Sequence, residues 1–401
     1  MEEKDMKKVL AIVLALAMVL GLAACGGSSS SSTGTGTTAQ SAVVKIGVYE
    51  PQSGDNGAGG KQEILGMQYA NSVQPTVTIG GTEYTVELVY ADNESSNDKA
   101  VSAASQLIGA GCAVVLGSYG SGVSIAASDT FAEAGIPVIG VTCTNPQVTE
   151  GNDHYFRICF LDPFQGTVMA NFAKENFGAK TAYCLGQLGN DYDQGLINYF
   201  KQAAEGLGMT VVTESFPEGN SDFTSYLTNA KNAGAEVIFA PCSTSYAQLI
   251  IEQAATQGVA MPLLAGDTWD SNVILAAAKG KDLDIEVSTF YQEGANESFE
   301  SGFKAWINAD STNLANNGGD DTLAAVSVMG YDAYFTALAA MQKAGSVAAA
   351  DILAALPSTT YTGITGEIKF DSIGDAERDS AVIKKVDTAN GVWEFVAVQG
   401  I

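Results

Sequence analysis

Polar side chains follow several predicted strands where those strands end, and they are suited to binding a small ligand. Ser121 lies in a glycine-rich loop after the strand predicted over 113–117, and Thr144 follows the strand predicted over 137–141. Ligands of open parallel sheets bind beyond the carboxyl ends of the strands, so adjacent strand ends would bring both hydroxyls to one rim. The loop has neither the spacing of a P-loop nor its lysine. Two hydroxyls beside a helix N-terminus therefore indicate a site for the carboxylate of a ligand.

Asp267 is the complementary candidate, because it follows the strand predicted over 262–265 in the second half of the chain. A buried carboxylate is costly unless it is paired, so one in a cleft favours a cation. A rim of hydroxyls that faces a carboxylate would fit a zwitterion. Three alternatives remain open: Ser121 caps the helix that follows it, Asp267 caps a helix over 271–278, or Asp267 is a plain solvated side chain.

Catalytic and metal-binding arrangements find little support in the sequence. The one histidine, His154, lies near a strand start and far from the predicted rim, so it is poorly placed to activate Ser121. The carboxylates that could pair with Asp267 for hydrolysis are Asp191 and Asp270. None of the six cysteines belongs to a CxxC pair, which argues against zinc. We expect a binding protein without metal or cofactor, and a small-molecule hydrolase is the less favoured alternative.

The elements that must position these residues alternate regularly. Short runs rich in β-branched residues alternate with helical stretches of about ten to eighteen residues, which is typical of a parallel α/β sheet. Strands are predicted over 44–49, 84–90, 113–117, 137–141, 181–185, 210–216, 237–240 and 262–265. Helices are predicted over 62–71, 98–110, 123–134, 163–176, 194–207, 223–233 and 246–257.

This rhythm is repeated, which predicts two similar lobes. One series of strand–helix units ends near residue 160, and a second begins at 181. The tail changes character and could cross back to complete both lobes, with a hinge between them. Its predicted elements are helices over 299–306, 323–343 and 347–356, and strands over 361–370 and 382–398 with a hairpin turn at Asn390-Gly391.

We therefore predict an α/β fold of two Rossmann-like lobes, each with a central and mostly parallel sheet. A chain of 401 residues exceeds the size at which a single core usually stops growing, which also favours two lobes. Lobe 1 is predicted to comprise 42–161 and about 290–362, and lobe 2 to comprise 162–289 and about 363–401.

The first 41 residues have the pattern of an export signal and a tether. Two lysines precede an apolar run over 9–22, which is short for a bilayer span of ~20 residues. Residues 22–25 resemble a bacterial lipobox, so Cys25 is predicted to carry lipid after removal of 1–24. A plain signal peptide with an incidental cysteine is the alternative. Residues 25–41 are rich in glycine, serine and threonine and are predicted to form a flexible tether.

The charge composition limits the kinds of partner that this protein can bind. With 45 acidic and 19 basic residues, the net charge of −26 argues against nucleic acid and anionic lipid surfaces. We expect the membrane to be contacted only through the lipid, at the extracytoplasmic face of the cell membrane, on the outer surface of a one-membrane bacterium or in the periplasm. The five cysteines after Cys25 lie mostly in apolar runs and are expected to be small buried hydrophobic residues.

The chain from Val43 to about Val398 resembles the branched-chain amino-acid-binding proteins of ABC importers, which have the type I periplasmic-binding-protein fold. The order and spacing of several short segments carry this resemblance. They are Pro51-Gln52-Ser53-Gly54, Gly66, Gly117 to Ser121, Ala127-Ser128-Asp129, Gly135 to Ile139, Asn145-Pro146, Tyr192 to Gly195, Gly330 to Ala333, Thr365-Gly366 and Phe370-Asp371.

The resemblance implies roles for five residues. Ser121 and Thr144 would bind the carboxylate of an amino acid, and Thr144 would use both its side chain and its backbone N–H. The backbone carbonyl of Thr142 would accept from the ammonium. Asp267 would pair with the ammonium, where the best-known members have Glu. Tyr192 would close over the ligand from the second lobe.

The departures from the family concern the pocket for the ligand's side chain. Small residues around Gly57 to Gly60 replace an aromatic position, and Ser243 lies where some relatives carry Tyr. Tyr119 stands where an aliphatic residue is common, and Trp269 lies two residues after Asp267. We take Tyr119 and Trp269 as candidate pocket residues, with plain packing as the alternative. The ligand's side chain therefore stays open between aliphatic, aromatic and larger polar types.

Together these features predict a monomeric solute-binding lipoprotein that captures an amino acid between two lobes and delivers it to an ABC transporter permease. One alternative keeps the receptor but changes the ligand to an amide or short peptide. A receptor domain for signalling is disfavoured, because no transmembrane or effector segment follows Val398.

Overall fold

The computed structural model describes residues 42–401, so the predicted signal, Cys25 and the tether lie outside the described residues. Within this range no helix combines the length and the apolar character that a bilayer crossing requires. The five cysteines in it are all free and buried, which confirms the expectation that they pack as small hydrophobic side chains.

The first sheet has six strands in the order β2-β3-β1-β4-β5-β6 and is parallel except for the β2–β3 pair. Both of its faces are covered, which explains why the inner strands β4 and β5 are short, fully buried apolar runs, whereas β2 at the edge alternates. On β1, Val44, Ile46 and Val48 enter the core on one face, and Tyr49 enters the core on the other. The strands are β1 (Ala42–Glu50), β2 (Thr76–Ile79), β3 (Thr82–Asp92), β4 (Val114–Leu116), β5 (Val138–Gly140) and β6 (Tyr155–Arg157).

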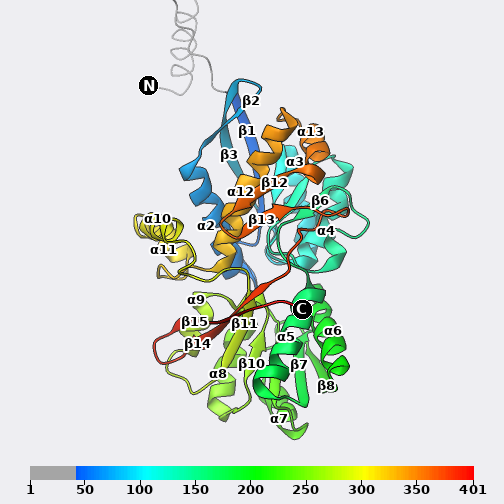
Figure 1. Cartoon of the computed structure of the whole chain (residues 1–401), viewed down its shortest axis with the longest axis vertical. Helices are drawn as coiled ribbons and strands as arrows, with labels where there is room; N and C mark the ends of the chain where they lie inside the picture. The colour runs from blue at the N-terminus through cyan, green and yellow to red at the C-terminus, as the bar shows by residue number, and fades with distance from the viewer. Residues whose placement is uncertain (1–41) are drawn as a thin grey trace, which may run out of the picture. The chain divides into compact units, whose positions relative to one another are not determined.

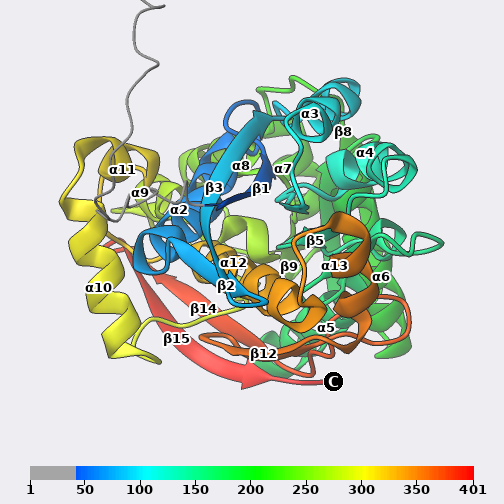
Figure 2. The same ribbon diagram turned by 90° about the horizontal axis from the view of Figure 1, so that it is seen from above.

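Helices α2 and α12 share the core on one face of this sheet, and α3 and α4 share the core on the other (Figure 2). Helices α2 and α12 cross closely because glycine stands at the crossing. A Cβ on Gly66 would lie 1.8 Å from the carbonyl oxygen of Ser327, and one on Gly330 would lie 2.2 Å from that of Glu63. The helices are α2 (Gly57–Val73), α3 (Asn97–Gly109), α4 (Ser121–Glu133), α10 (Glu297–Asn308), α11 (Ser311–Asn316), α12 (Ala325–Ala344) and α13 (Ala349–Ala355).

The second sheet has seven strands in the order β15-β14-β11-β10-β9-β7-β8. Strands β7 to β11 are parallel, and the antiparallel hairpin β14–β15 extends the sheet beyond β11 (Figure 1). Its strands are β7 (Thr181–Gln187), β8 (Thr210–Phe216), β9 (Val237–Phe239), β10 (Leu263–Ala265), β11 (Ile285–Thr289), β14 (Ala381–Asp387) and β15 (Val392–Gln399).

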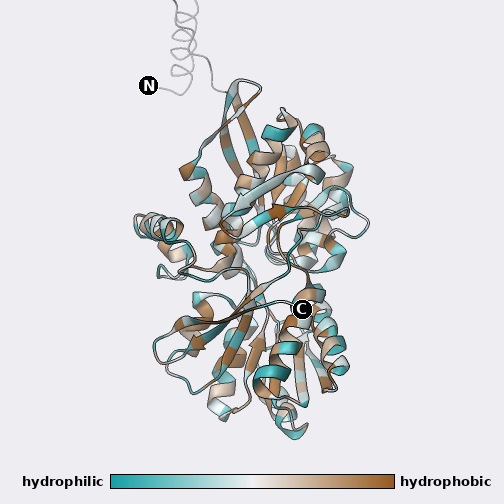
Figure 3. Ribbon diagram, viewed as in Figure 1, coloured by the Kyte–Doolittle hydropathy of each residue, from teal (hydrophilic) through white to brown (hydrophobic). Residues whose placement is uncertain are grey.

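Helices cover both faces of the second sheet as well. One core lies under α5 and α6, and another lies under α7, α8 and α9. Figure 3 shows the apolar residues concentrated along the strands of both sheets. The helices are α5 (Asp162–Phe177), α6 (Asp191–Gly206), α7 (Thr224–Asn232), α8 (Thr244–Gln257) and α9 (Asn272–Ala278).

Each sheet with its helices forms one lobe, and the predicted fold class is confirmed. Within residues 42–401 the chain passes between the lobes three times: after β6, after β11 and before β14. A buried ion pair joins two of these passages, because Nε of Arg157 donates to Oδ1 of Asp375 at 2.5 Å. The lobe boundaries given above stay a prediction.

The structure corrects one expectation about the late segments and adds three strands. The single strand predicted over 361–370 is two short paired strands, β12 (Thr360–Gly363) and β13 (Gly366–Lys369). Gly366 has φ +99°, a left-handed conformation that suits glycine in the turn between them. Strands β2, β6 and β11 were not predicted, whereas the hairpin turn at Asn390-Gly391 is confirmed.

Candidate ligand-binding site

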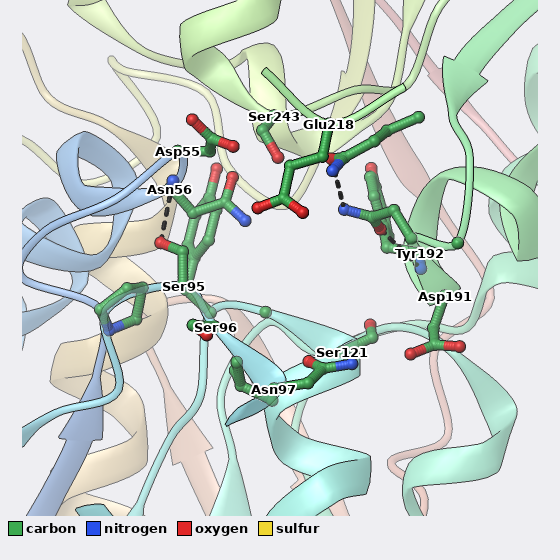
Figure 4. A pocket seen from close by; sticks show the side chains of 18 of the residues that line it. Asp55, Asn56, Ser95, Ser96, Asn97, Ser121, Asp191, Tyr192, Glu218 and Ser243 are labelled. Atoms are coloured by element: carbon green, nitrogen blue, oxygen red, sulfur yellow. Dashed lines mark hydrogen bonds between the residues drawn. The ribbon is translucent and has the colours of Figure 1, made fainter. Parts of the chain in front are cut away.

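A cavity of about 280 Å³ lies between the two lobes. Its walls are the loops that follow the carboxyl ends of parallel strands in both sheets, which is where α/β folds bind ligands. The first lobe contributes loops after β1, β3 and β4, and the second lobe contributes loops after β7, β8, β9 and β10. Figure 4 shows the side chains of both lobes around this cavity. The candidate residues on its wall are Tyr119, Ser121 and Tyr192.

Ser121 lies at the beginning of α4 and faces this cavity. The residue that caps the helix is Gly120, so the alternative in which Ser121 is the cap is wrong. The Ser121 hydroxyl accepts from the backbone N–H of Asn145 at 3.2 Å, which ties the loop after β4 to the loop after β5. The hydroxyl hydrogen is left to be donated into the cavity, as a carboxylate site requires.

Thr142 and Thr144 follow β5 and are buried deeper, behind the wall of the cavity. The Thr142 hydroxyl donates to Oε2 of Glu63 at 2.6 Å. The Thr144 hydroxyl has no hydrogen-bond partner within the described residues. The carboxyl group of Asp162, which is also buried, lies close to this hydroxyl. Because buried hydroxyls are normally paired, an unpaired one close behind the wall is a candidate contact for a ligand.

Asp267 begins a short 3-10 turn after β10, and its side chain is almost fully buried. Its Oδ1 accepts from Nε2 of Gln165 and from the Tyr192 hydroxyl, each at 2.9 Å. Burial raises the pKa of Asp267 to about 6, although both hydrogen bonds oppose that rise. The cap of α9 is Ser271, whose hydroxyl accepts from the N–H of Val273, so the capping alternative for Asp267 is wrong.

Tyr119 connects the two lobes beside this site. The Tyr119 hydroxyl, from the first lobe, donates to the carbonyl of Thr268 in the second lobe at 3.2 Å. The Tyr119 ring lies against Gly59, where a Cβ would be 2.4 Å from Cζ. Gly59, one of the small residues at 57–60, therefore makes room for the Tyr119 ring, so two departures from the family pattern compensate each other.

Trp269 does not face the cavity. Its side chain is 0% exposed in the core of the second lobe, and its Nε1 donates to the carbonyl of Cys242 at 3.1 Å. This placement favours the packing alternative for Trp269. The structure thus brings Ser121 and Tyr192 together at the cavity, with Asp267 directly behind Tyr192, and leaves Trp269 apart.

The chain matches the family described as Periplasmic binding protein over residues 43–389. It belongs to the periplasmic binding protein family.

Similar proteins support this assignment. The Leu/Ile/Val-binding protein homolog 2 of Brucella abortus (strain 2308) is 28% identical over 339 residues, which are 83% of this chain and 88% of that protein. The crystal structure of a leucine binding protein, LivK, from Thermotoga maritima is 31% identical, with a TM-score of 0.78, over 89% of this chain and 99% of that one. A benzoate-bound solute binding protein from R. palustris shares the fold at 20% identity, with a TM-score of 0.77 over 89% of this chain and 96% of that one.

Sequence reasoning missed two carboxyl groups of this periplasmic binding protein. Glu50 ends β1, and its Oε2 accepts from the backbone N–H of Tyr119 at 2.6 Å. Glu63 projects from α2, and the two carboxyl groups lie next to each other in the interior. Burial raises the pKa of Glu63 to about 7, and burial together with the Glu63 charge raises the pKa of Glu50 well above its usual range. Glu50 could have been found as a carboxylate at a strand end, whereas no pattern places Glu63 beside it.

Proposed function

We propose that this protein is an extracytoplasmic receptor that captures an amino acid between its lobes and delivers it to an ABC transporter permease. The observation that carries this proposal is the pairing of Asp267. Its carboxylate is buried with two neutral partners, Gln165 and Tyr192, and forms no ion pair within the described residues. A carboxylate held in this way is stabilised when a ligand brings a cation to it.

The first lobe offers the matching groups for the other charge of an amino acid. The Ser121 hydroxyl and the start of α4 lie on the cavity wall, and the unpaired Thr144 hydroxyl lies behind it. Hydroxyls and helix N-termini bind carboxylates well. The relatives named for leucine, isoleucine and valine support the amino-acid class, while the benzoate-bound relative shows only that the fold also accepts other carboxylates.

Contacts across the cavity support closure of the lobes around the ligand. Besides the Tyr119 contact, the Ser245 hydroxyl donates to Oδ1 of Asp55 at 3.0 Å, and Nδ2 of Asn145 donates to the carbonyl of Asp191 at 2.8 Å. Closure of this kind gives a partner a surface that differs between the free and loaded receptor. We propose that a permease recognises that surface and that the receptor acts as a monomer without catalytic activity.

The proposal also covers the location of the protein. Lipid on Cys25 and the tether over 25–41 would hold the receptor at the extracytoplasmic face of the membrane. A tether raises the effective concentration of a receptor near a membrane partner.

Calorimetry on protein that has been unfolded and refolded to remove carried-over ligand tests the function. We expect at least one α-amino acid to bind, and Asp267→Asn to weaken its affinity by about 30-fold or more, because removing one partner of a buried charge pair costs about 2–5 kcal/mol. Asp129→Asn, on the exposed side of α4, is the matched control and should bind as the wild type does. The proposal fails if no amino acid binds, or if Asp267→Asn leaves the affinity unchanged.

A further inference from the structure

We propose that Asp55, Glu218 and Ser243 form a second cation-binding subsite in the cavity, so that the captured amino acid has a cationic side chain. This inference rests on the proposed function and names the ligand class within it. The ligand expected here differs from leucine, isoleucine and valine, the apolar amino acids after which the relatives are named.

The cavity wall carries charge of one sign. Four carboxylate residues line it, and none of its lining residues is lysine, arginine or histidine. None of the four forms an ion pair within residues 42–401. A wall of one sign focuses its field into the cavity and raises the local concentration of a ligand with the opposite charge.

Two of the four carboxylates have a local explanation, and two do not. Asp98 and Asp191 lie in the first turns of α3 and α6, where the helix dipole stabilises a negative charge. Asp55 and Glu218 lie in loops, the first before α2 and the second after β8. Asp55 accepts from the neutral Ser245 hydroxyl at 3.0 Å, which leaves its charge, like that of Glu218, to be balanced by a cation in the cavity.

Asp55 and Glu218 come from opposite lobes and lie near a common group. The hydroxyl of Tyr246 accepts from the N–H of Gly219, the neighbour of Glu218, at 2.9 Å. The charges of both Asp55 and Glu218 act on that hydroxyl. Figure 4 shows Asp55, Ser243 and Glu218 along one side of the cavity and Ser121 on the opposite side.

Ser243 is an independent indication of a ligand. Its residue is only 3% exposed, its side chain lines the cavity, and its hydroxyl makes no hydrogen bond to any described residue. Figure 4 shows this side chain directed into the cavity between Asp55 and Glu218. A hydroxyl oxygen between two carboxylates completes a set of acceptors for an ammonium or guanidinium group.

The rest of the wall fits a long polar side chain better than a branched apolar one. Its aliphatic residues are Pro51, Val123 and Leu188, which are too few to enclose a leucine side chain. An amino acid whose carboxylate lies at Ser121 would extend its side chain across the cavity toward Asp55 and Glu218. Within the described residues, no three acidic, histidine or cysteine side chains converge as a metal site requires, so the cation belongs to an organic ligand.

Calorimetry with matched pairs of ligands tests this subsite. L-Arginine and L-citrulline have nearly the same shape but differ in charge, and L-lysine and L-norleucine form a second such pair. We expect the cationic member of at least one pair to bind at least tenfold more tightly than its neutral partner, which is about 1.4 kcal/mol. L-Leucine should be no better than the neutral members.

Variants of Glu218 and Asp55 then test whether these two residues cause the preference for the cationic ligand. Glu218→Gln should reduce the preference for the cationic ligand about threefold, since Glu218 is solvent-exposed, and the double variant with Asp55→Asn should reduce it at least tenfold. Affinity for the neutral partner should stay within twofold in every variant. Asp129→Asn is the charge-matched control and should change neither value.

The possible outcomes distinguish a failure of the cation subsite from a failure of the proposed function. If neutral amino acids bind as tightly as their cationic partners, or if the double variant keeps the full preference, the subsite is refuted while the amino-acid receptor stands. If cadaverine, the diamine that lacks the carboxylate of lysine, binds and every amino acid fails to bind, the cation subsite stands and the amino-acid receptor is refuted. If none of these ligands binds but another α-amino acid does, only the subsite is refuted, and if cadaverine and every amino acid fail to bind, both are refuted.

Discussion

Asp162 offers a direct test of how burial controls charge in this molecule. It is the first residue of α5, it is fully buried, and its backbone N–H donates to the carbonyl of Thr144 at 3.0 Å. Its carboxyl oxygens make no hydrogen bond of ordinary geometry to any described residue, although the Thr144 hydroxyl is close enough to oppose the shift. Burial raises the pKa of Asp162 to about 8.

The magnitude follows from proton linkage. An unfolded aspartate has a pKa near ~3.9, so between about pH 4 and pH 8 the folded protein holds a proton that the unfolded chain has released. The free energy of unfolding from this group is therefore greatest at low pH and falls by ~1.4 kcal/mol for each unit that the pH rises. The dipole of α5 stabilises the ionised form of Asp162 by only ~0.3–1 kcal/mol, which is less than one pH unit. The interval from pH 5 to pH 7 therefore lies between the pKa values of the unfolded and the folded state.

The perturbation is Asp162→Asn, which removes the titrating group and leaves the shape similar. We expect the stability of the variant relative to the wild type to rise by about 3 kcal/mol from pH 5 to pH 7, because only the wild type loses the contribution of this proton. The assay is urea unfolding of ligand-free, refolded protein at several pH values. Asp129→Asn, at an exposed position, should differ from the wild type by the same amount at every pH. A difference for Asp162→Asn that stays constant over this range would refute the argument, because it would mean that Asp162 is ionised in the folded protein.

Three further predictions concern the other residues of the site and the anchor. Gly59→Ala should weaken amino-acid binding and lower stability by about 1–3 kcal/mol, because its Cβ would lie 2.4 Å from Cζ of Tyr119, whereas Gly109→Ala, in open space on α3, should leave binding unchanged and should not lower the melting temperature. Trp269→Phe should lower the free energy of unfolding by about 1–3 kcal/mol, because the smaller ring leaves space in the core and the buried Cys242 carbonyl keeps only one of its two donors, the Thr268 hydroxyl, and a changed order of ligand preference in calorimetry would contradict the packing role. Cys25→Ser should move the protein from the membrane fraction to the soluble fraction without changing ligand affinity, and continued membrane association would contradict the lipid anchor.

Much of the fold could be predicted, because it rests on local patterns. Strands covered on both faces are continuous apolar runs, and glycines with positive φ at 178 and 258 end α5 and α8, as glycine commonly does. The unpredicted strands β6 and β11 contain charged residues that are buried, Arg157 and Glu286. Arg157 is paired with Asp375, more than 200 residues away, so its burial leaves no local pattern in the sequence.

In the candidate site, too, some residues could be predicted from the sequence and others are brought in only by the fold. Ser121 and Asp267 could be proposed because they follow predicted strands, and strand ends gather at one edge of a sheet. The partners of Asp267 could not, because Gln165 lies within the helix α5 and is brought to it only by the fold. Glu63 is likewise placed by the close crossing of α2 and α12, which depends on two glycines that carry no chemistry of their own.

The three passages between the lobes bear on how the protein is made. The second sheet receives its last two strands, β14 and β15, from residues 381–399, although its parallel strands are complete at residue 289. A nascent chain therefore carries β11 as an open edge until β14, about a hundred residues later, has been synthesised. An open edge of this kind is a template for pairing with other chains. Chains that stop early, by nonsense mutation or proteolysis, would be expected to aggregate and not to accumulate as a folded single lobe.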